Sequence, residues 1–210
     1  MARPRKVSDE QVFAAAQRVM ARVGPSELTL ALIAREAGVT PGALVQRFGS
    51  KRDLMLRMAG LLAGGIGQLF DQLRERHESP LAVIRAYATC MAEMAVTPEA
   101  LARNFAYLQV DLTDPGLRAH LVVTARETRR ELLALIAEAK KRGELATDAP
   151  ATPLAKNIEA LVSGALMTWA FYREGNAATW LRSHVEALLS PYTTASREPR
   201  AGRRVRPRKP

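Results

Sequence analysis

The chain has few cysteine, histidine or aromatic side chains with which to carry out chemistry. Of its 210 residues, one is cysteine, three are histidine and 5% are aromatic. The single Cys90 excludes an internal disulfide framework and is typical of a protein of the reducing cytoplasm. His77, His120 and His184 lie far apart in the sequence, and none has a metal-ligand spacing. We therefore predict no metal and no other cofactor.

Motifs of two further protein classes are also missing. No nucleophile elbow of the Gly-x-Ser-x-Gly type and no phosphate-binding loop occurs, so little supports an enzyme. No apolar run approaches the ~20 residues that a bilayer requires, and the basic start of the chain does not resemble a signal peptide. The sequence thus favours a cytoplasmic protein that has no membrane partner.

Positive charge is in excess, and it is concentrated at the two ends of the chain. The formal net charge is +10 at pH 7. Residues 1–60 hold ten Lys and Arg against five Asp and Glu, whereas residues 61–196 hold 14 against 15. The tail 197–210 holds seven against one, with three prolines and no apolar period. We expect this tail to be disordered, either adding non-specific attraction to phosphates or having no role.

Two short helices that meet at a glycine are predicted between residues 29 and 48. Thr29 is a suitable N-cap, and the apolar residues after it recur at the spacing of one helical face up to Ala37. Gly38 can adopt the left-handed conformation that ends such a helix. Thr40 caps the second helix, and Pro41 suits its first position. This is the pattern of a helix-turn-helix, which carries its second helix into a DNA groove.

The second helix has an inner and an outer face. Leu44 and Phe48 form an apolar pair that faces the first helix. The small residues Gly42 and Ala43 allow close approach to a groove, and the outward residues Gln46 and Arg47 suit adenine and guanine edges. Ser50 caps the next helix, whose first-turn Lys51 and Arg52 are positioned to meet a phosphate.

This segment resembles the DNA-binding domain of TetR-type transcriptional regulators. The matching positions are Ile33-Ala34, Ala37-Gly38-Val39, Gly42-Ala43-Leu44, Phe48 and Ser50-Lys51-Arg52-Asp53-Leu54. Val45 departs from the pattern, because the family usually has a tyrosine there that contacts the DNA backbone. The resemblance implies a homodimer that binds a pseudo-palindromic operator in double-stranded DNA and responds to a small-molecule effector, most often as a repressor.

A DNA-binding domain is expected at residues 6–65. Ser8 and Gln11 form a capping box for a preceding helix, and three helices then share one small core. The basic arm at residues 3–6 would reach the adjacent backbone or minor groove, or it would be a basic terminus without a role. The predicted DNA-binding residues are Arg5, Lys6, Thr29, Thr40, Pro41, Gly42, Ala43, Gln46, Arg47 and Lys51.

Residues 66–193 are predicted to form a second, all-α domain that binds an effector and dimerises. One helix should run from residue 51 to about residue 76, with glycines in its middle that indicate close packing or a flexible joint. Ser79-Pro80, Thr97-Pro98, Asp114-Pro115 and Thr152-Pro153 each predict a helix start, and a last helix is expected at about 177–189. The predicted fold class is therefore all-α, a three-helix helix-turn-helix domain followed by a helical ligand-binding and dimerisation domain.

The last two predicted helices carry wide apolar stripes. These stripes would either bind a partner surface or pack inside the chain's own core. In the family that the motif resembles, two C-terminal helices of each subunit pair into a four-helix bundle. The predicted interface residues are Ile158, Leu161, Leu166, Trp169, Trp180, Val185 and Leu188.

The central helices carry the candidate effector pocket. Adaptable and aromatic side chains there could line an apolar cavity with a few polar anchors, although such residues also form ordinary cores. The predicted pocket residues are Tyr87, Met91, Met94, Phe105, Leu108, Asp111, Met167 and Phe171. A protein that coats DNA regardless of sequence is the alternative, and the discrete recognition helix and the near-neutral second domain argue against it.

Overall fold

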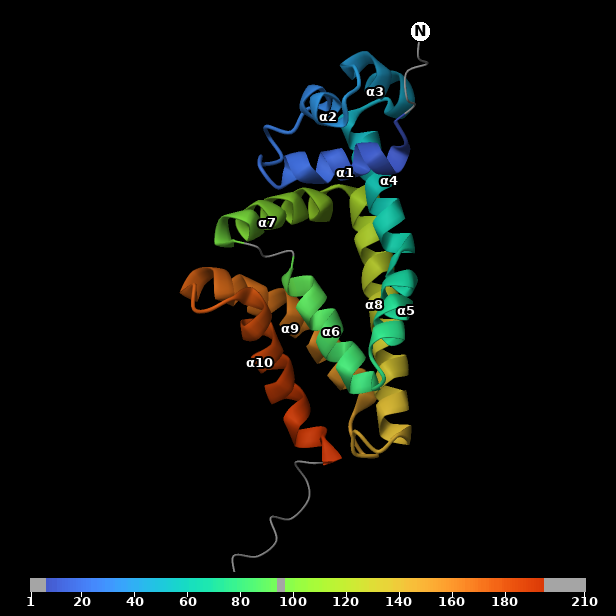
Figure 1. Cartoon of the computed structure of the whole chain (residues 1–210), viewed down its shortest axis with the longest axis vertical. Coiled ribbons are helices and arrows are strands. Elements are labelled where there is room, and N and C mark those ends of the chain that lie inside the picture. The colour runs from blue at the N-terminus through green and yellow to red at the C-terminus, as the bar shows by residue number, and fades with distance from the viewer. Residues whose placement is uncertain (1–6, 94–96, 195–210) are drawn as a thin grey trace, which may run out of the picture.

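The computed structural model describes residues 7–93 and 97–194, and these residues form helices in two parts of one elongated molecule (Figure 1). Among the described residues, β-type pairing occurs as an isolated antiparallel bridge between Leu145 and Thr193. The helices are α1 (Asp9–Met20), α2 (Leu30–Ala37), α3 (Pro41–Phe48), α4 (Lys51–Gly64), α5 (Ile66–Arg76), α6 (Pro80–Ala92), α7 (Pro98–Thr113), α8 (Pro115–Lys141), α9 (Ala151–Tyr172), α10 (Ala177–Leu189) and the short 3-10 helix η1 (Ser190–Tyr192).

Most helices begin where the sequence supplies an N-cap. The side chains of these caps accept a hydrogen bond from a backbone N–H two or three residues further on, which satisfies a donor that the first helical turn leaves free. The caps are Ser8, Thr29, Thr40, Ser50, Ser79, Thr97, Asp114 and Asn176. The predicted start at Thr152-Pro153 is wrong by a residue or two, because α9 begins at Ala151 without a side-chain cap.

The turn between α2 and α3 is the one that the sequence predicts. Gly38 ends α2 with φ +69°, in the left-handed region. The N–H of Val39 then donates to the carbonyl of Ala34 at 3.0 Å, which satisfies a carbonyl at the end of α2. The chain can therefore reverse within three residues and start α3 at Pro41.

The single helix expected at residues 51–76 is instead two helices, and this expectation is corrected. Gly65 lies between α4 and α5 with φ −87° and ψ −6°, and its N–H donates to the carbonyl of Leu62 at 3.1 Å. That bond spans three residues rather than four, so the helix tightens and breaks there. Gly64 and Gly65 together lower the helix propensity at this point. A Cβ on Gly60 would lie 3.3 Å from the His120 ring, so close packing also applies within this stretch, and a flexible joint stays a prediction.

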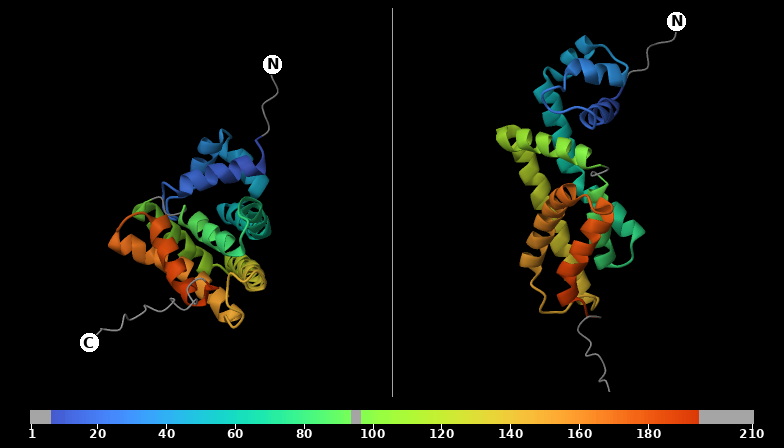
Figure 2. Two further views of the ribbon diagram at one scale, coloured as in Figure 1. Left: turned by 60° about the horizontal axis from the view of Figure 1, so that its bottom comes forward. Right: turned by 90° about the vertical axis from the view of Figure 1, so that its left-hand side faces the viewer.

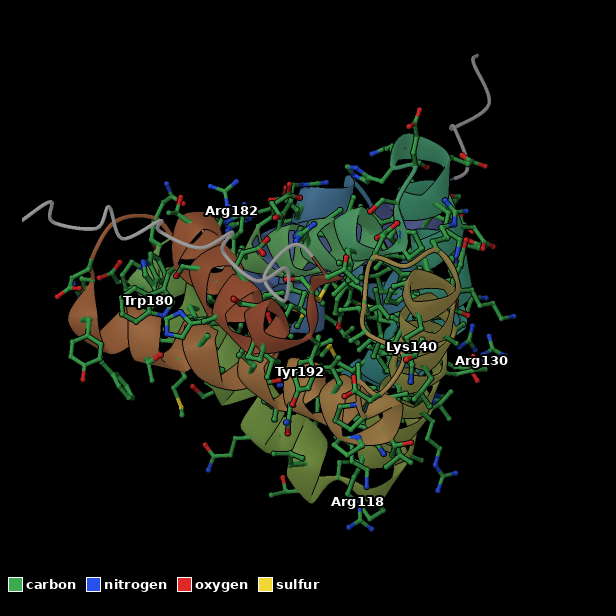
Figure 3. All side chains as sticks on the ribbon, turned by 90° about the horizontal axis from the view of Figure 1, so that it is seen from below. Arg118, Arg130, Lys140, Trp180, Arg182 and Tyr192 are labelled. Carbon is green, nitrogen blue, oxygen red and sulfur yellow. The ribbon has the colours of Figure 1, made fainter. Side chains whose placement is uncertain are left out.

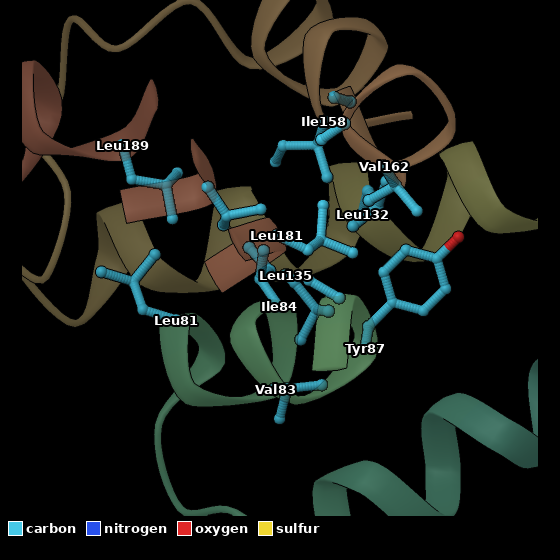
Figure 4. Close-up of a cluster of buried hydrophobic side chains, with 14 of the residues drawn as sticks. Leu81, Val83, Ile84, Tyr87, Leu132, Leu135, Ile158, Val162, Leu181 and Leu189 are labelled. Atoms are coloured by element: carbon cyan, nitrogen blue, oxygen red, sulfur yellow. The ribbon is translucent and has the colours of Figure 1, made fainter. Parts of the chain in front are cut away.

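The molecule has two hydrophobic cores. The core of the head, which we define as α1–α3 and the start of α4, contains Val12, Ile33, Leu44, Phe48 and Leu54. The core of the body, α5 to α10, joins side chains of α6, α8, α9 and α10, as Figure 4 shows. Its fully buried members include Ile84, Leu135, Ile158 and Leu181.

The head lies at one end of the molecule, and α7 lies directly beneath it (Figures 1 and 2). The long helix α8 runs down the body beside α4 and α5. Thr194, the last described residue, lies at the end of the body away from the head. Arg5, Lys6, Met94 and the tail 197–210 lie outside the described residues.

Candidate nucleic-acid interface

The helix α3 presents a small, exposed surface at the tip of the head. Leu44 and Phe48 are 1% and 3% exposed and face the core, whereas Pro41, Gly42, Ala43 and Gln46 are exposed. The hydroxyl of Thr40 accepts a hydrogen bond from Ala43 N at 3.2 Å and so holds the first turn. Thr29 is exposed and caps α2 in the same way, through Leu32 N at 3.2 Å. The predicted outer face of α3 is therefore exposed to solvent, and we call its residues Pro41, Gly42, Ala43 and Gln46 the exposed block.

Arg47 is the predicted base-contacting residue that lies apart from this block. Its side chain is half-buried, and its guanidinium donates to the carbonyl of Val7 at 2.6 Å and forms an ion pair with Asp9. Both partners lie at the start of α1, so Arg47 points along the side of the head.

Lys51 also has partners inside the head. Its Nζ donates to the carbonyls of Leu28 at 2.9 Å and Pro25 at 3.2 Å, which hold the loop between α1 and α2. The residue is exposed and stands at the first turn of α4. Val45, at the position where the resemblance leads one to expect a tyrosine, is 50% exposed and presents only an apolar side chain.

Two clusters of contacts connect the head to the body, and the sequence did not reveal them. At the first, Arg52 donates two hydrogen bonds to the carboxylate of Asp114, at 2.6 and 2.9 Å. Asp114 also caps α8, and its pKa is lowered to about 2, first by Arg52 and then by the backbone N–H groups that it accepts. A Cβ on Gly116 would lie 2.9 Å from Leu56, so α8 approaches α4 closely at this point.

The second cluster joins α7 to the end of α1. Arg103 Nε donates to the carbonyl of Ala21 at 2.8 Å, and the Tyr107 hydroxyl donates to the carbonyl of Val23 at 3.0 Å. Tyr107 is 6% exposed and belongs to the core of the head, although α7 is part of the body. Arg103 and Tyr107 are four positions apart, which is the spacing of one helical face, but nothing in the sequence identifies a backbone carbonyl as their target.

The predicted pocket residues that the structure describes lie in different surroundings. Tyr87 is buried, stacks on Phe70 with ring centroids 5.0 Å apart, and has its pKa raised to about 12 by burial. Met91 and Phe105 pack partly buried against the body core. Asp111 is half-buried, and burial raises the pKa of its carboxyl.

Three other pocket candidates lie on the surface. Leu108, Met167 and Phe171 are 37%, 43% and 71% exposed, so we correct the assignment of Met167 and Phe171 to an interior pocket. Two hollows lie elsewhere in the described part of the body. One, near the end away from the head, is lined by residues that include Ser79, Arg85 and Glu186, and the other lies between the ends of α6 and α9.

The predicted interface residues divide into two groups. Ile158, Leu166, Trp169 and Val185 are at most 7% exposed and belong to the body core, so their assignment to a partner surface is corrected. The apolar face of α9 that they define is used inside the chain. Leu161, Trp180 and Leu188 are only partly buried against that core.

The structure gives no support to a membrane span or a metal centre in the residues it describes. Across residues 7–93 and 97–194, no helix is both long enough and apolar enough to cross a bilayer. The same residues contain no group of three or more His, Cys, Asp or Glu side chains able to hold a metal ion.

Two family models match the chain. Residues 12–58 match the model described as bacterial regulatory proteins, tetR family, and residues 82–185 match the tetracyclin repressor-like C-terminal domain. The HTH-type transcriptional repressor BepR of Brucella suis biovar 1 (strain 1330) is 29% identical over 171 residues, which are 79% of this chain and 82% of BepR.

Solved structures share the fold. A TetR transcription regulator from Haloarcula marismortui superposes with a TM-score of 0.71 at 16% identity, over 88% of this chain and 97% of that chain. FadR of Bacillus subtilis, solved in complex with stearoyl-CoA, gives a TM-score of 0.66 at 18% identity, over 87% and 98% of the two chains. The chain belongs to the tetR family of bacterial regulatory proteins, and it is a DNA-binding regulator of transcription.

Proposed function

We propose that this tetR-family regulator is a cytoplasmic repressor that binds a pseudo-palindromic operator as a homodimer and releases it when a small molecule binds the body. The observation that carries the proposal is the exposed block on α3, where small residues at positions 41–43 precede the outward Gln46. Small side chains let the helix start approach base edges, and glutamine can bond an adenine edge through two hydrogen bonds. The named repressor BepR supports the repressing role.

Replacing Gln46 with Ala tests the DNA-reading role of α3. We expect the variant to lose about 1–3 kcal/mol of discrimination at one base pair of each half-site, since each good bidentate contact contributes that much. Gln68→Ala is the matched control, because Gln68 is exposed on α5, outside the head.

The measurement is footprinting and binding to a series of single-base operator variants. Protection of one or two short sites with dyad symmetry supports a repressor. Uniform protection of all DNA would instead indicate a coating protein, and unchanged base preference in Gln46→Ala would contradict the role of α3.

We place the proposed dimer surface on the outer faces of α9 and α10. Met167 and Phe171 are four residues apart and exposed, and Tyr172 is 65% exposed beside Trp180, with ring centroids 5.9 Å apart. The partly buried Leu188 extends the same apolar surface. A surface of this kind on the last two helices is what a two-fold interface requires.

We infer that the effector acts through α7. Phe105 packs against the body core, whereas Tyr107, two residues later, packs in the head core. A ligand among α6, α7 and α8, near Tyr87 and Met91, would therefore move a helix whose other side holds the end of α1. Such a ligand lowers DNA affinity only if it binds better to the conformation that does not fit the operator. The complex of B. subtilis FadR with stearoyl-CoA supports a small-molecule effector in this fold. A ligand screen that follows operator release would identify the chemical class of the effector of this chain.

A further inference from the structure

The guanidinium of Arg47 has partners on three sides within the head. It donates to the carbonyl of Val7 at 2.6 Å, and it forms an ion pair with Asp9 in the first turn of α1. Its carbon Cζ lies 5.4 Å from the ring centroid of Phe48, the residue that closes α3 over the core. Arg57 of α4 lies over the same ring at 5.3 Å. Arg47 therefore adds a polar connection between the recognition helix and α1, beside the apolar contact of Phe48 with Phe13.

We propose that Arg47 is a positioning residue, which sets the angle of α3 against α1 and does not itself contact a base. The proposal rests on the proposed function, in which α3 enters the groove. The eight-residue helix α3 buries only Leu44 and Phe48, which are four positions apart on one face. Phe48 packs against Phe13 of α1, with ring centroids 5.7 Å apart. The bonds from Arg47 to Val7 and Asp9 hold a second side of α3 to the start of α1, next to this buried line of contact. Gln46 and the turn at positions 41–43 then keep one orientation towards DNA.

The test compares two carboxylates in the same turn. Asp9→Asn removes the partner of Arg47, whereas Glu10→Gln removes an equal charge from the next residue, which forms no direct ion pair with Arg47. A hydrogen bond with Ser8 and, as the smallest contribution, the charge of Arg47 lower the pKa of Glu10, so Glu10 senses Arg47 through charge alone. Removing a negative charge near DNA should by itself leave binding unchanged or strengthen it.

We expect Glu10→Gln to bind the operator at least as tightly as the unmodified chain, and Asp9→Asn to bind it more weakly by roughly two- to thirtyfold, for an exposed ion pair broken in each of two subunits. Arg47→Ala should weaken binding without changing the dependence on salt, and the double variant with Asp9→Asn should be no weaker than Arg47→Ala alone. Arg47→Lys, which keeps a charge towards Asp9, should restore part of the affinity.

Three outcomes would overturn the proposal. The first is tighter operator binding by Asp9→Asn. The second is a salt slope that falls in magnitude by about 1.8 in Arg47→Ala, as for one lost phosphate contact per subunit of a dimer. The third is a base preference that Arg47→Ala relaxes at a single position. Thermal unfolding of each full-length variant ensures that affinities are compared between folded proteins. Gln46→Ala on the same operator tests the proposed function of α3 separately from the role of Arg47. If this variant loses base preference, α3 enters the groove, even where Asp9→Asn binds as tightly as the unmodified chain.

Discussion

Tyr107 shows how a single side chain can belong to two parts of the molecule. It stands on α7, yet it is buried in the core of the head and its hydroxyl donates to the carbonyl of Val23. The last carbonyls of α1 and the turn after it lack helical partners, so an external donor there satisfies groups that would otherwise need water. Arg103 supplies a second donor, to Ala21.

Tyr107→Phe should therefore loosen the head from the body. We expect a loss of about 0.5–1.5 kcal/mol in the free energy of unfolding, the usual contribution of one hydrogen bond. Burial raises the pKa of Tyr107 to about 12 from the ordinary 10.0. A folded-state pKa above the unfolded one means that this stabilisation is complete below pH 10 and is lost as the pH rises towards 12.

The difference in stability between the unmodified chain and Tyr107→Phe should accordingly shrink over that alkaline range. Urea unfolding at a series of pH values measures it, with Tyr192→Phe as the control, because Tyr192 lies in η1, outside the head. A Tyr107→Phe variant as stable as the unmodified chain at neutral pH would show that the bond to Val23 contributes nothing.

In the head, the sequence predicts which residues cap or bury a helix better than it predicts the hydrogen-bond partners of long side chains. The caps and the buried pair on α3 depend on neighbours within four positions, which the sequence displays directly. The partners of Arg47 and Lys51 include the carbonyls of Val7, Pro25 and Leu28. Every residue has such a carbonyl, and a long side chain can reach one that is far away in sequence, so no pattern reveals these bonds.

At the scale of helices, glycine position decides where α4 ends. Gly64 and Gly65 are adjacent, and both have negative φ, since neither is among the residues with a left-handed backbone. A Cβ at Gly64 would meet nothing within 4 Å. The glycines are therefore not required by backbone strain or by crowding, and their effect on this joint is to make the helix easier to interrupt.

Gly64→Ala should stabilise the chain, by about 0.4–1 kcal/mol, because alanine restricts the unfolded chain and favours the helical backbone. Gly38→Ala should destabilise it by about 1–2 kcal/mol, since Gly38 has φ +69° and a Cβ is unfavourable there. Calorimetric unfolding of both variants measures the difference. An equal effect of the two substitutions would contradict the view that, of these two positions, only Gly38 needs a glycine.

The elements themselves could largely be predicted, and the break between α4 and α5 could not be located. Ser or Thr followed by Pro marks a helix start through local chemistry, and it did so at Pro41, Pro80 and Pro98. Glycines occur at several positions from 60 to 67, and each weakens the helix to a similar extent. Which of them interrupts it depends on the packing of α4 on α8, where the His120 ring lies against Gly60.

On the scale of the whole molecule, the head is held by two body helices that meet at one residue. Asp114 follows α7 and caps α8, and it also binds Arg52 of α4. A movement of α7 or α8 therefore reaches the head at α1 and at α4 together. Contacts between residues 52 and 114, or 23 and 107, are separated too widely in sequence for any local pattern to predict them.

The proposed dimer surface illustrates the same limit. Apolar periodicity on α9 and α10 correctly identified amphipathic helices, but it could not say which apolar residues serve the chain's own core. Ile158 and Val185 are fully buried there, whereas Phe171 is exposed. In Figure 3, Trp180 lies on the opposite side of the body from Arg130 and Lys140, so the outer surface of α9 and α10 is remote from the charged side of α8.

Met167→Glu together with Phe171→Glu should convert the proposed dimer into a folded monomer. Both side chains are exposed in the chain, so the substitutions should leave its own core intact while placing four carboxylates in an apolar two-fold interface. Leu61→Glu with Leu62→Glu is the control, because these residues are 55% and 56% exposed on α4, across the molecule from α10 in Figure 1. Sedimentation gives the mass, and operator binding should fall sharply in the monomer, since one head then meets only one half-site. An unmodified chain that sediments as a monomer while binding its operator specifically would refute the dimer, and dissociation by the control pair alone would place the interface on α4.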